Sequence, residues 1–278
     1  MELGKVRITF SVTITTAIGY FLAPEPWNGN VIWPVLGILA IGMGSASLNH
    51  LQDRKLDEKM LRTRNRPFPT NRVTVFQASI IILFLIVTGC FLLYFFSGLP
   101  SMILGISALI WYNGIYTYLK RVSSIAVIPG AIIGGIPPAL GWMSAGGPIL
   151  DPFILSVSSM LVVWQIPHFW LLLFMYSDDY DRAGLPNLIN VISEYRLKVI
   201  TFAAIVLTVV SAFVIFYAGN ILMHWTAALS LIASCKLLWD ARAMASAKKS
   251  VNYRGVFMSI NIYTLIILTL VLLGRFVK

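Results

Sequence analysis

Residues 49–72 read NHLQDRKLDEKMLRTRNRPFPTNR, a run of polar and charged residues in a chain that is otherwise strongly apolar. Of the 278 residues, 58% are hydrophobic and only 12% are charged, whereas soluble domains average about 25% charged residues. The mean hydropathy is +0.82. This composition indicates a membrane protein, so the polar run lies between segments that we expect inside the bilayer.

Apolar segments on both sides of residues 49–72 are long enough to cross a bilayer as helices, which takes about 20 residues each. They lack the alternation of polar and apolar residues that a transmembrane barrel needs. The predicted fold class is therefore all-α: a polytopic membrane protein with nine transmembrane helices in a single domain over residues 1–278. The predicted spans are residues 7–23, 31–51, 74–97, 99–118, 123–143, 152–176, 197–218, 221–241 and 255–274.

The basic residues indicate how the chain crosses the membrane. Nine spans leave the termini on opposite sides, and 19 of the 21 Lys and Arg residues fall on the N-terminal side, against Arg275 and Lys278 on the other. Because loops rich in Lys and Arg stay in the cytoplasm, we expect a protein of the cytoplasmic membrane. Its N-terminus and its loops at 53–73 and 177–198 would face the cytoplasm. The net charge of +10 follows from this topology, and we expect no nucleic acid partner.

Two clusters of acidic residues lie at predicted helix ends on this side. Asp53 and Asp57 follow the second span, and the second cluster occupies residues 178–181. Asn49, Asp53 and Asp57 are spaced i, i+4, i+8, which places them in a row on one helical face. Acids at helix ends can simply balance nearby Arg and Lys. Two clusters on the same side favour a divalent cation instead, and Mg²⁺ prefers one or two carboxylates plus waters and substrate phosphates.

Basic residues are interleaved with these acids. They are Arg62, Arg64, Arg66, Lys120, Arg121 and Arg182. Arginine can grip a phosphate through two parallel hydrogen bonds. The positive-inside rule explains basic residues in general but does not explain acids beside them, so the combination predicts a phosphorylated ligand.

The motifs resemble a known family. Residues 49–57, NHLQDRKLD, fit the NxxxDxxxD motif of the intramembrane aromatic prenyltransferase (UbiA) superfamily, and residues 177–184, SDDYDRAG, resemble its second aspartate-rich motif. The resemblance implies a nine-helix bundle around a lipid-accessible cavity, with Mg²⁺ ions holding a prenyl diphosphate between the two motifs.

Within that superfamily the sequence is most similar to the haem O synthases, the protohaem IX farnesyltransferases. The similarity covers residues 5 to about 190 and rests on DEKMLRTRNRP, YTYLKR, GGIPPALGW, WQIPHFW and DDYDRAGLP, in that order. Two positions depart from the family: Lys55 stands where Asp is frequent, and Asn187 stands where Met is usual. The similarity implies Mg²⁺-dependent transfer of farnesyl from farnesyl diphosphate to a vinyl group of haem B. It also suggests a terminal oxidase assembly system as a partner.

The resemblance also implies roles for individual residues. The catalytic acids would be Asp53, Asp57, Asp178 and Asp181, and the metal ligands would be these four together with Asn49 and Asp179. The diphosphate would be held by Arg62, Arg66, Lys120 and Arg121, and the ring of Tyr116 would stabilise the allylic cation.

His168 is a candidate for binding haem. It lies in the middle of a predicted span, where polar side chains are costly and tend to be functional. The alternative is a histidine whose hydrogen bonds are made by a neighbouring helix. His50, beside the acidic row but on another face, is the second candidate for contacting haem.

Two other functions remain open from the sequence. A related enzyme would prenylate a quinone precursor or another acceptor, and WQIPHFW argues against it. A transporter or haem channel would place ionisable groups near the bilayer midplane, whereas nearly all the acids of this chain lie at the cytoplasmic ends of predicted spans.

Overall fold

A computed structural model describes residues 2–24, 30–221, 223–247 and 250–277. Within these ranges the regular secondary structure is helical, with no strands. Seven helical segments are long and apolar enough to cross a membrane. Two further helices, α1 (Val6–Leu22) and α10 (His224–Ala241), bring the number in the described ranges to nine. The predicted all-α class and the helix count are confirmed, and the chain is a multi-pass membrane protein.

Two of the nine segments are composite. The fourth, Leu99–Leu119, consists of α4 (Leu99–Leu109), a π-helix η1 (Ile110–Tyr116) and α5 (Thr117–Leu119). The fifth, Val127–Ser144, consists of α6 (Val127–Ala131), a 3₁₀ turn η2 (Ile132–Gly135) and α7 (Ile136–Ser144). The other helices are α2 (Ile32–Asp57), α3 (Val75–Ser97), α8 (Pro152–Ala183), α9 (Glu194–Ala218) and α11 (Tyr253–Phe276), and the short turns are η3 (Leu188–Asn190) and η4 (Arg242–Ala245).

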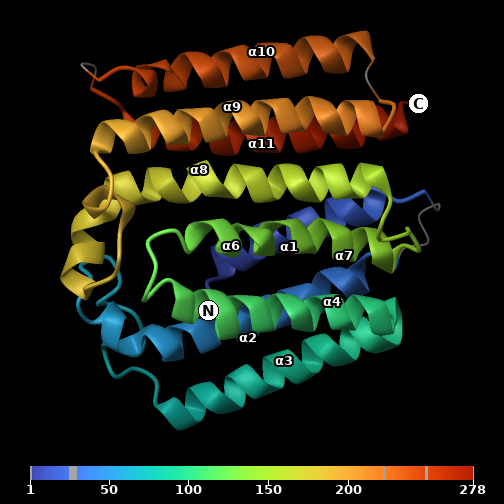
Figure 1. The fold of residues 1–278 in the computed structure, drawn as a ribbon. Coiled ribbons are helices and arrows are strands. Elements are labelled where there is room, and N and C mark those ends of the chain that lie inside the picture. The colour runs from blue at the N-terminus through green and yellow to red at the C-terminus, as the bar shows by residue number, and fades with distance from the viewer. Residues whose placement is uncertain (1, 25–29, 222, 248–249, 278) are drawn as a thin grey trace. The chain divides into compact units, whose positions relative to one another are not determined.

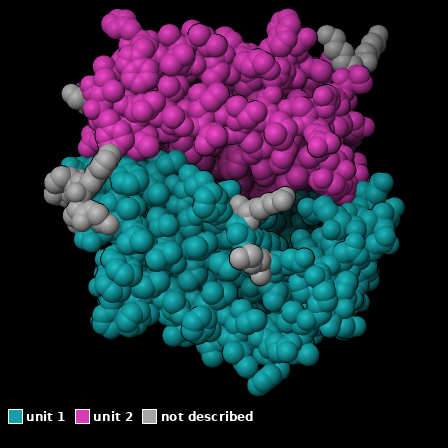
Figure 2. Space-filling view, turned by 180° about the vertical axis from the view of Figure 1, so that it is seen from behind, with its two compact units in different colours: residues 1–149, 178–186 teal, residues 150–177, 187–278 magenta. Residues whose placement is uncertain are grey.

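The chain divides into two compact units, which Figure 2 colours separately. Unit 1 comprises residues 1–149 and 178–186, and unit 2 comprises residues 150–177 and 187–278. The single domain over residues 1–278 stays a prediction. The division falls where α8 loses its helical conformation, because Tyr176 has φ −135° and ψ 23°. The second acidic cluster therefore belongs to unit 1, although its helix begins in unit 2.

Small residues allow the helices of unit 1 to approach closely, as is usual for membrane helices. A Cβ atom at Gly89 of α3 would lie 2.7 Å from the carbonyl oxygen of Gly37 on α2. A Cβ atom at Gly141 of α7 would lie 1.9 Å from the carbonyl oxygen of Thr16 on α1. These two crossings bring α2 against α3 and α1 against α7, and α4 lies beside α2 and α3 (Figure 1).

Unit 2 contains the first part of α8 together with α9, α10 and α11. Helix α9 packs against both α10 and α11, and these two also pack against each other (Figure 1). The hydroxyl groups of Ser234 on α10 and Tyr263 on α11 share a hydrogen bond of 3.3 Å. These two polar side chains are thus paired across helices, as the absence of water in a bilayer favours.

The outward faces of the helices carry large apolar side chains. On α3, Phe76 is 75% exposed and Phe84 is 68% exposed. A soluble protein rarely exposes contiguous apolar surface on this scale. These faces are therefore suited to lipid.

Candidate active site

The predicted row lies on one continuous helix. Helix α2 does not end near residue 51, where its apolar segment ends, but continues to Asp57. Asn49 is 2% exposed, Asp53 is 6% exposed and Asp57 is 3% exposed. The row is therefore buried along its whole length, so each charged group in it needs a partner.

Asn49 connects α2 to the N-terminus and to the fourth helical segment. Its Nδ2 donates to Asp53 Oδ2 at 2.9 Å and to Thr117 Oγ1 at 3.2 Å. Its Oδ1 accepts from Lys5 Nζ at 3.0 Å and from the Tyr112 hydroxyl at 3.3 Å. Burial, together with the positive charges of Arg66 and Lys120, lowers the pKa of Lys5 to about 7.

Asp53 is neutralised by two basic residues from the end of the fourth segment. Lys120 Nζ forms an ion pair with Asp53 Oδ2, and Arg121 Nη2 lies 3.1 Å from Asp53 Oδ1. Arg121 also donates to the carbonyl oxygen of Gln52 at 2.8 Å. Lys120 and Arg121, which are predicted to bind a diphosphate, thus form ion pairs with Asp53, which is predicted to bind the metal.

Polar groups in the middle of the spans fix the fourth segment against α2. Asn113 of the π-helix donates from Nδ2 to the Ser45 carbonyl oxygen at 3.0 Å and to Gln52 Oε1 at 3.1 Å. Gln52 Nε2 returns a hydrogen bond to the Asn113 carbonyl oxygen at 3.0 Å. These hydrogen bonds position the end of the fourth segment so that Lys120 and Arg121 contact Asp53. The sequence did not reveal the roles of Lys5, Tyr112, Asn113 and Thr117. The last three are polar residues within an apolar span, which is itself a signal of function.

Asp57 is only half satisfied. Its Oδ1 accepts from Arg66 Nη1 at 2.8 Å. Its Oδ2 is buried and has no hydrogen-bond partner among the described residues. A buried carboxylate oxygen without a partner is costly, so this atom is suited to meet a ligand.

The second acidic cluster holds the loop that follows α2. Asp179 is 7% exposed, and its carboxylate accepts from the backbone amides of Leu61 at 2.9 Å and Arg62 at 3.2 Å. Arg182 lies 3.6 Å from the same carboxylate. Around it, Met60 packs with Ala183 and Leu185. The structure thus brings the two acidic segments side by side.

The other two acids of this cluster, Asp178 and Asp181, are exposed. Within the described ranges, no three His, Cys, Asp or Glu side chains converge closely enough to hold a metal ion. The structure therefore unites Asn49, Asp53 and Asp57 with basic residues, while the metal roles of residues 178–181 stay a prediction.

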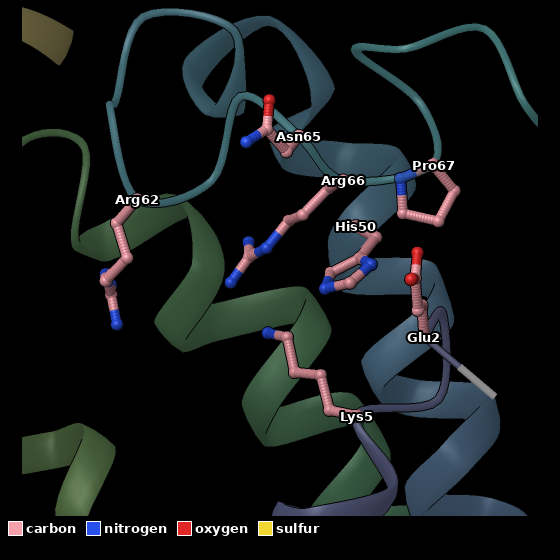
Figure 3. A pocket seen from close by; sticks show the side chains of 7 residues that line it. All are labelled: Glu2, Lys5, His50, Arg62, Asn65, Arg66 and Pro67. Carbon is pink, nitrogen blue, oxygen red and sulfur yellow. The ribbon is translucent and has the colours of Figure 1, made fainter.

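A cavity of about 300 Å³ lies beside the row, where the side chains of Lys5, His50 and Arg66 point toward one another (Figure 3). His50 is 2% exposed, and neither of its ring nitrogens has a partner among the described residues. The cavity is predominantly basic. Its lining residues are Glu2, Lys5, His50, Arg62, Asn65, Arg66 and Pro67.

Tyr116 lies in the fourth helical segment, close to Lys120 and Arg121 at its end. Its ring stacks on Tyr112 with centroids 5.6 Å apart and planes at 20°. Lys120 Nζ is 5.9 Å from the centroid of the Tyr116 ring. Gly130 makes room for this ring, because a Cβ atom there would lie 2.6 Å from it. Tyr116 therefore lies beside the basic residues that pair with Asp53, and its role toward an allylic cation stays a prediction.

The two residues that depart from the family pattern, Lys55 and Asn187, lie outside the acidic row. Lys55 is exposed and lies off the face of the row. Asn187 is buried, and its Oδ1 accepts from the backbone amides of Ile189 at 2.8 Å and Asn190 at 3.3 Å. Lys55 leaves the row intact, and Asn187 acts as the cap of η3.

His168 belongs to unit 2. Its Nδ1 lies 3.0 Å from Asn261 Oδ1 on α11. The centroids of the Trp164 and Phe257 rings each lie 4.7 Å from the centroid of its imidazole. A neighbouring helix thus satisfies one ring nitrogen, as the structural alternative expected. Among the described residues the other nitrogen, Nε2, forms no hydrogen bond, and the haem-binding role of His168 stays a prediction.

The row fits a hard divalent cation. The row offers an amide oxygen and two carboxylates, and one oxygen of Asp57 has no partner among the described residues. Mg²⁺ prefers oxygen ligands of this kind and needs few of them when waters and phosphates complete its shell. The basic residues that now face the row are the natural partners of that phosphate.

Comparisons with known proteins identify the family. The model of the UbiA prenyltransferase family matches residues 12–263. A protoheme IX farnesyltransferase of Thioalkalivibrio sulfidiphilus is 34% identical over 266 residues, covering 91% of this chain and 87% of the relative. Another of the same name, from Geobacter sulfurreducens, is 35% identical over 186 residues, covering 67% and 68%.

Solved structures share the fold. A structure described as digeranylgeranylglyceryl phosphate synthase superposes with a TM-score of 0.81 at 15% identity, over 100% of this chain and 97% of that one. A UbiA homologue from Archaeoglobus fulgidus bound to GPP and Mg²⁺ has a TM-score of 0.63 at 11% identity, over 99% of each chain. With the acidic row on α2, the nine helices and a family model that matches most of its length, the chain belongs to the UbiA prenyltransferase family.

Proposed function

We propose that the protein transfers a farnesyl group from farnesyl diphosphate to a vinyl group of haem B, with Mg²⁺, and so makes haem O. The observation that carries this proposal is the buried row of Asn49, Asp53 and Asp57 set against basic residues of the first two cytoplasmic loops. The names of relatives at 34–35% identity support farnesyl as the donor group and haem as the acceptor.

The charges of the site suit a diphosphate bound with a metal ion. Asp53 and Asp57, with Asn49 and the acids at 178–181, would hold Mg²⁺. When bound, the ion supplies positive charge that stabilises the diphosphate as it leaves. The basic residues Arg66, Lys120 and Arg121 would then turn from the carboxylates to the phosphate oxygens, and Arg62 would join them there. Such fixed cations stabilise the charge that develops in the transition state.

The bond changes follow from this arrangement. The C1–O bond of farnesyl diphosphate breaks, and its electron pair leaves with the diphosphate. The allylic cation is stabilised by the faces of Tyr116 and Tyr112 and shielded from water by the apolar helices. The vinyl π electrons of haem B form the new bond to C1, and water then adds to the resulting cation and loses a proton.

His168 would bind the haem iron, since imidazole is a common axial ligand, and His50 would contact haem from the basic cavity. The enzyme would lie in the cytoplasmic membrane with both acidic segments facing the cytoplasm, as its basic loops indicate. Its product would pass to a terminal oxidase assembly system.

Purified protein incubated with haem B, Mg²⁺ and a series of prenyl diphosphates tests the proposal, with products identified by mass spectrometry. We expect farnesylated, hydroxylated haem, its loss in EDTA and its return with excess Mg²⁺. Prenylation of a quinone precursor instead of haem would favour the related enzyme. Haem or prenyl diphosphate crossing a vesicle membrane without any product would favour the transporter.

A further inference from the structure

A pair of hydrogen bonds in unit 2 fixes the orientation of one amide. Asn261 on α11 donates from Nδ2 to the backbone carbonyl oxygen of Phe257, one turn earlier, at 2.5 Å. Its Oδ1 lies 3.0 Å from His168 Nδ1 on α8. A backbone carbonyl can only accept a hydrogen bond, so the NH₂ group of Asn261 faces Phe257 and the amide oxygen faces the imidazole.

The orientation of the amide determines the tautomer of the histidine. Since the amide oxygen only accepts, the proton of this hydrogen bond belongs to His168 Nδ1. In the neutral ring, Nε2 then carries the lone pair. The Trp164 and Phe257 rings, each 4.7 Å away between centroids, restrict rotation of the imidazole. The ring thus presents one defined nitrogen as an electron-pair donor.

A second, independent observation indicates a ligand at this place. Trp164 and Gln165 lie within one turn of His168 on α8, and the indole Nε1 and the amide Oε1 are buried without hydrogen-bond partners among the described residues. Two unpartnered polar groups beside a histidine are costly inside a membrane protein. They are expected where a bound molecule completes the hydrogen bonding.

We propose that Asn261 is a positioning residue for the acceptor substrate. It holds His168 as the Nδ1–H tautomer, so that Nε2 coordinates the iron of haem B. This inference rests on the proposed function for the identity of the acceptor. Histidine ligands of metals usually donate their other N–H to an acceptor in this way, and loss of that acceptor typically costs about 10–100-fold in affinity.

Two variants separate positioning from packing. Asn261→Leu keeps the approximate size but removes the acceptor, whereas Asn261→Asp keeps an oxygen facing Nδ1. Ser259→Ala is the matched control, because Ser259 also lies on α11 and its hydroxyl donates to Asp240 on α10 at 2.5 Å. Asn261→Leu and Ser259→Ala each remove a polar contact between helices, but only Asn261→Leu removes the acceptor for His168.

The tautomer is measured directly by nitrogen NMR of ¹⁵N-histidine-labelled protein without haem, with His168→Ala used to assign the signal. We expect protonated Nδ1 in the parent protein, Ser259→Ala and Asn261→Asp, and a mixture of tautomers in Asn261→Leu. Protonated Nε2 in the parent protein would overturn the inference, whatever the substrate is.

Haem binding is the second measurement. The parent protein and Ser259→Ala should give the same Soret band and the same iron–histidine stretch in resonance Raman spectra. Asn261→Leu should lose about 10–100-fold in haem affinity and weaken that stretch, and Asn261→Asp should restore both.

If Asn261→Leu matches the parent protein while His168→Ala loses the ligand signal, the role of Asn261 is wrong and the proposed function stands. If haem binds with no histidine signature in the parent protein, the role of Asn261 as a positioning residue is wrong. If no haem product forms either, the proposed function is also wrong.

Discussion

At the scale of single residues, the two carboxylates of the α2 row differ in what they neutralise. Asp53 faces both Lys120 and Arg121, whereas Asp57 faces Arg66 and keeps one oxygen without a partner in the described part of the chain. Removing Asp53 therefore leaves two partly buried cations unpaired. Removing Asp57 leaves one cation whose side chain is 28% exposed.

We predict that Asp53→Asn lowers the free energy of unfolding by about 2 kcal/mol, less than the 3–5 kcal/mol of a fully buried pair because its partners are partly exposed. The Tm should fall by about 4–8 °C, while Asp57→Asn should change it by about 1–3 °C. Both variants should lose at least about 100-fold in turnover. Thermal unfolding in detergent and product assays check this, with the exposed Glu58→Gln as control. Equal Tm values, or full turnover in either variant, would contradict it.

At the scale of helices and loops, hydropathy predicts most of the architecture. The nine apolar segments are found because a helix needs about 20 apolar residues to cross the bilayer, and the i, i+4, i+8 row is found because α-helical spacing is fixed. Hydropathy does not show that α2 continues to Asp57, because the end of an apolar segment is not the end of a hydrogen-bond ladder. The same limit hides the π-helix at residues 110–116 and the break at Tyr176.

The partners of the row are the part of the site that the sequence does not reveal. Lys5 contacts Asn49 from 44 positions away, and Thr117 contacts it from 68 positions away. Only the tertiary structure brings such residues together. The role of Asp179 was hidden in the same way, because its carboxylate contacts backbone amides, which every residue carries.

Asp179 also gives a prediction at this scale. Its carboxylate holds the amides of Leu61 and Arg62, and hydrogen bonds to a charged group each contribute about 1.5–3 kcal/mol. We expect Asp179→Ala to loosen the loop after α2 and to speed tryptic cleavage at Lys59, Arg62 or Arg64 by about tenfold or more. Asp178→Ala is the matched control for cleavage, because Asp178 is the exposed neighbour. Equal cleavage of the two variants would show that the loop does not depend on Asp179.

At the scale of the whole molecule, the distribution of charge predicts the orientation in the membrane. A basic loop is costly to carry across the membrane, and the loop after α2 contains Arg62, Arg64 and Arg66. Three spans separate this loop from residues 145–151, and because three is an odd number, we expect residues 145–151 on the opposite side. Substrate access depends on this orientation, because a soluble diphosphate and its Mg²⁺ would reach the row from the side that the basic loops face.

Cysteine labelling tests the orientation in a variant with Cys90→Ala and Cys235→Ala, which removes both native thiols. We expect Arg64→Cys to react with a membrane-impermeant maleimide only in inside-out vesicles, because the predicted orientation places the loop after α2 in the cytoplasm. Leu150→Cys, at a position that is 78% exposed, should react only from the outside of intact cells. The two probes lie on the same chain in the same membrane, so each is the control for the accessibility of the other. Labelling of both positions from one side would contradict the predicted topology, because it requires an even number of crossings between them. The helix α3 and the two composite segments provide three. Labelling with the two sides exchanged would place the acidic row on the side of the membrane away from the cytoplasmic diphosphate.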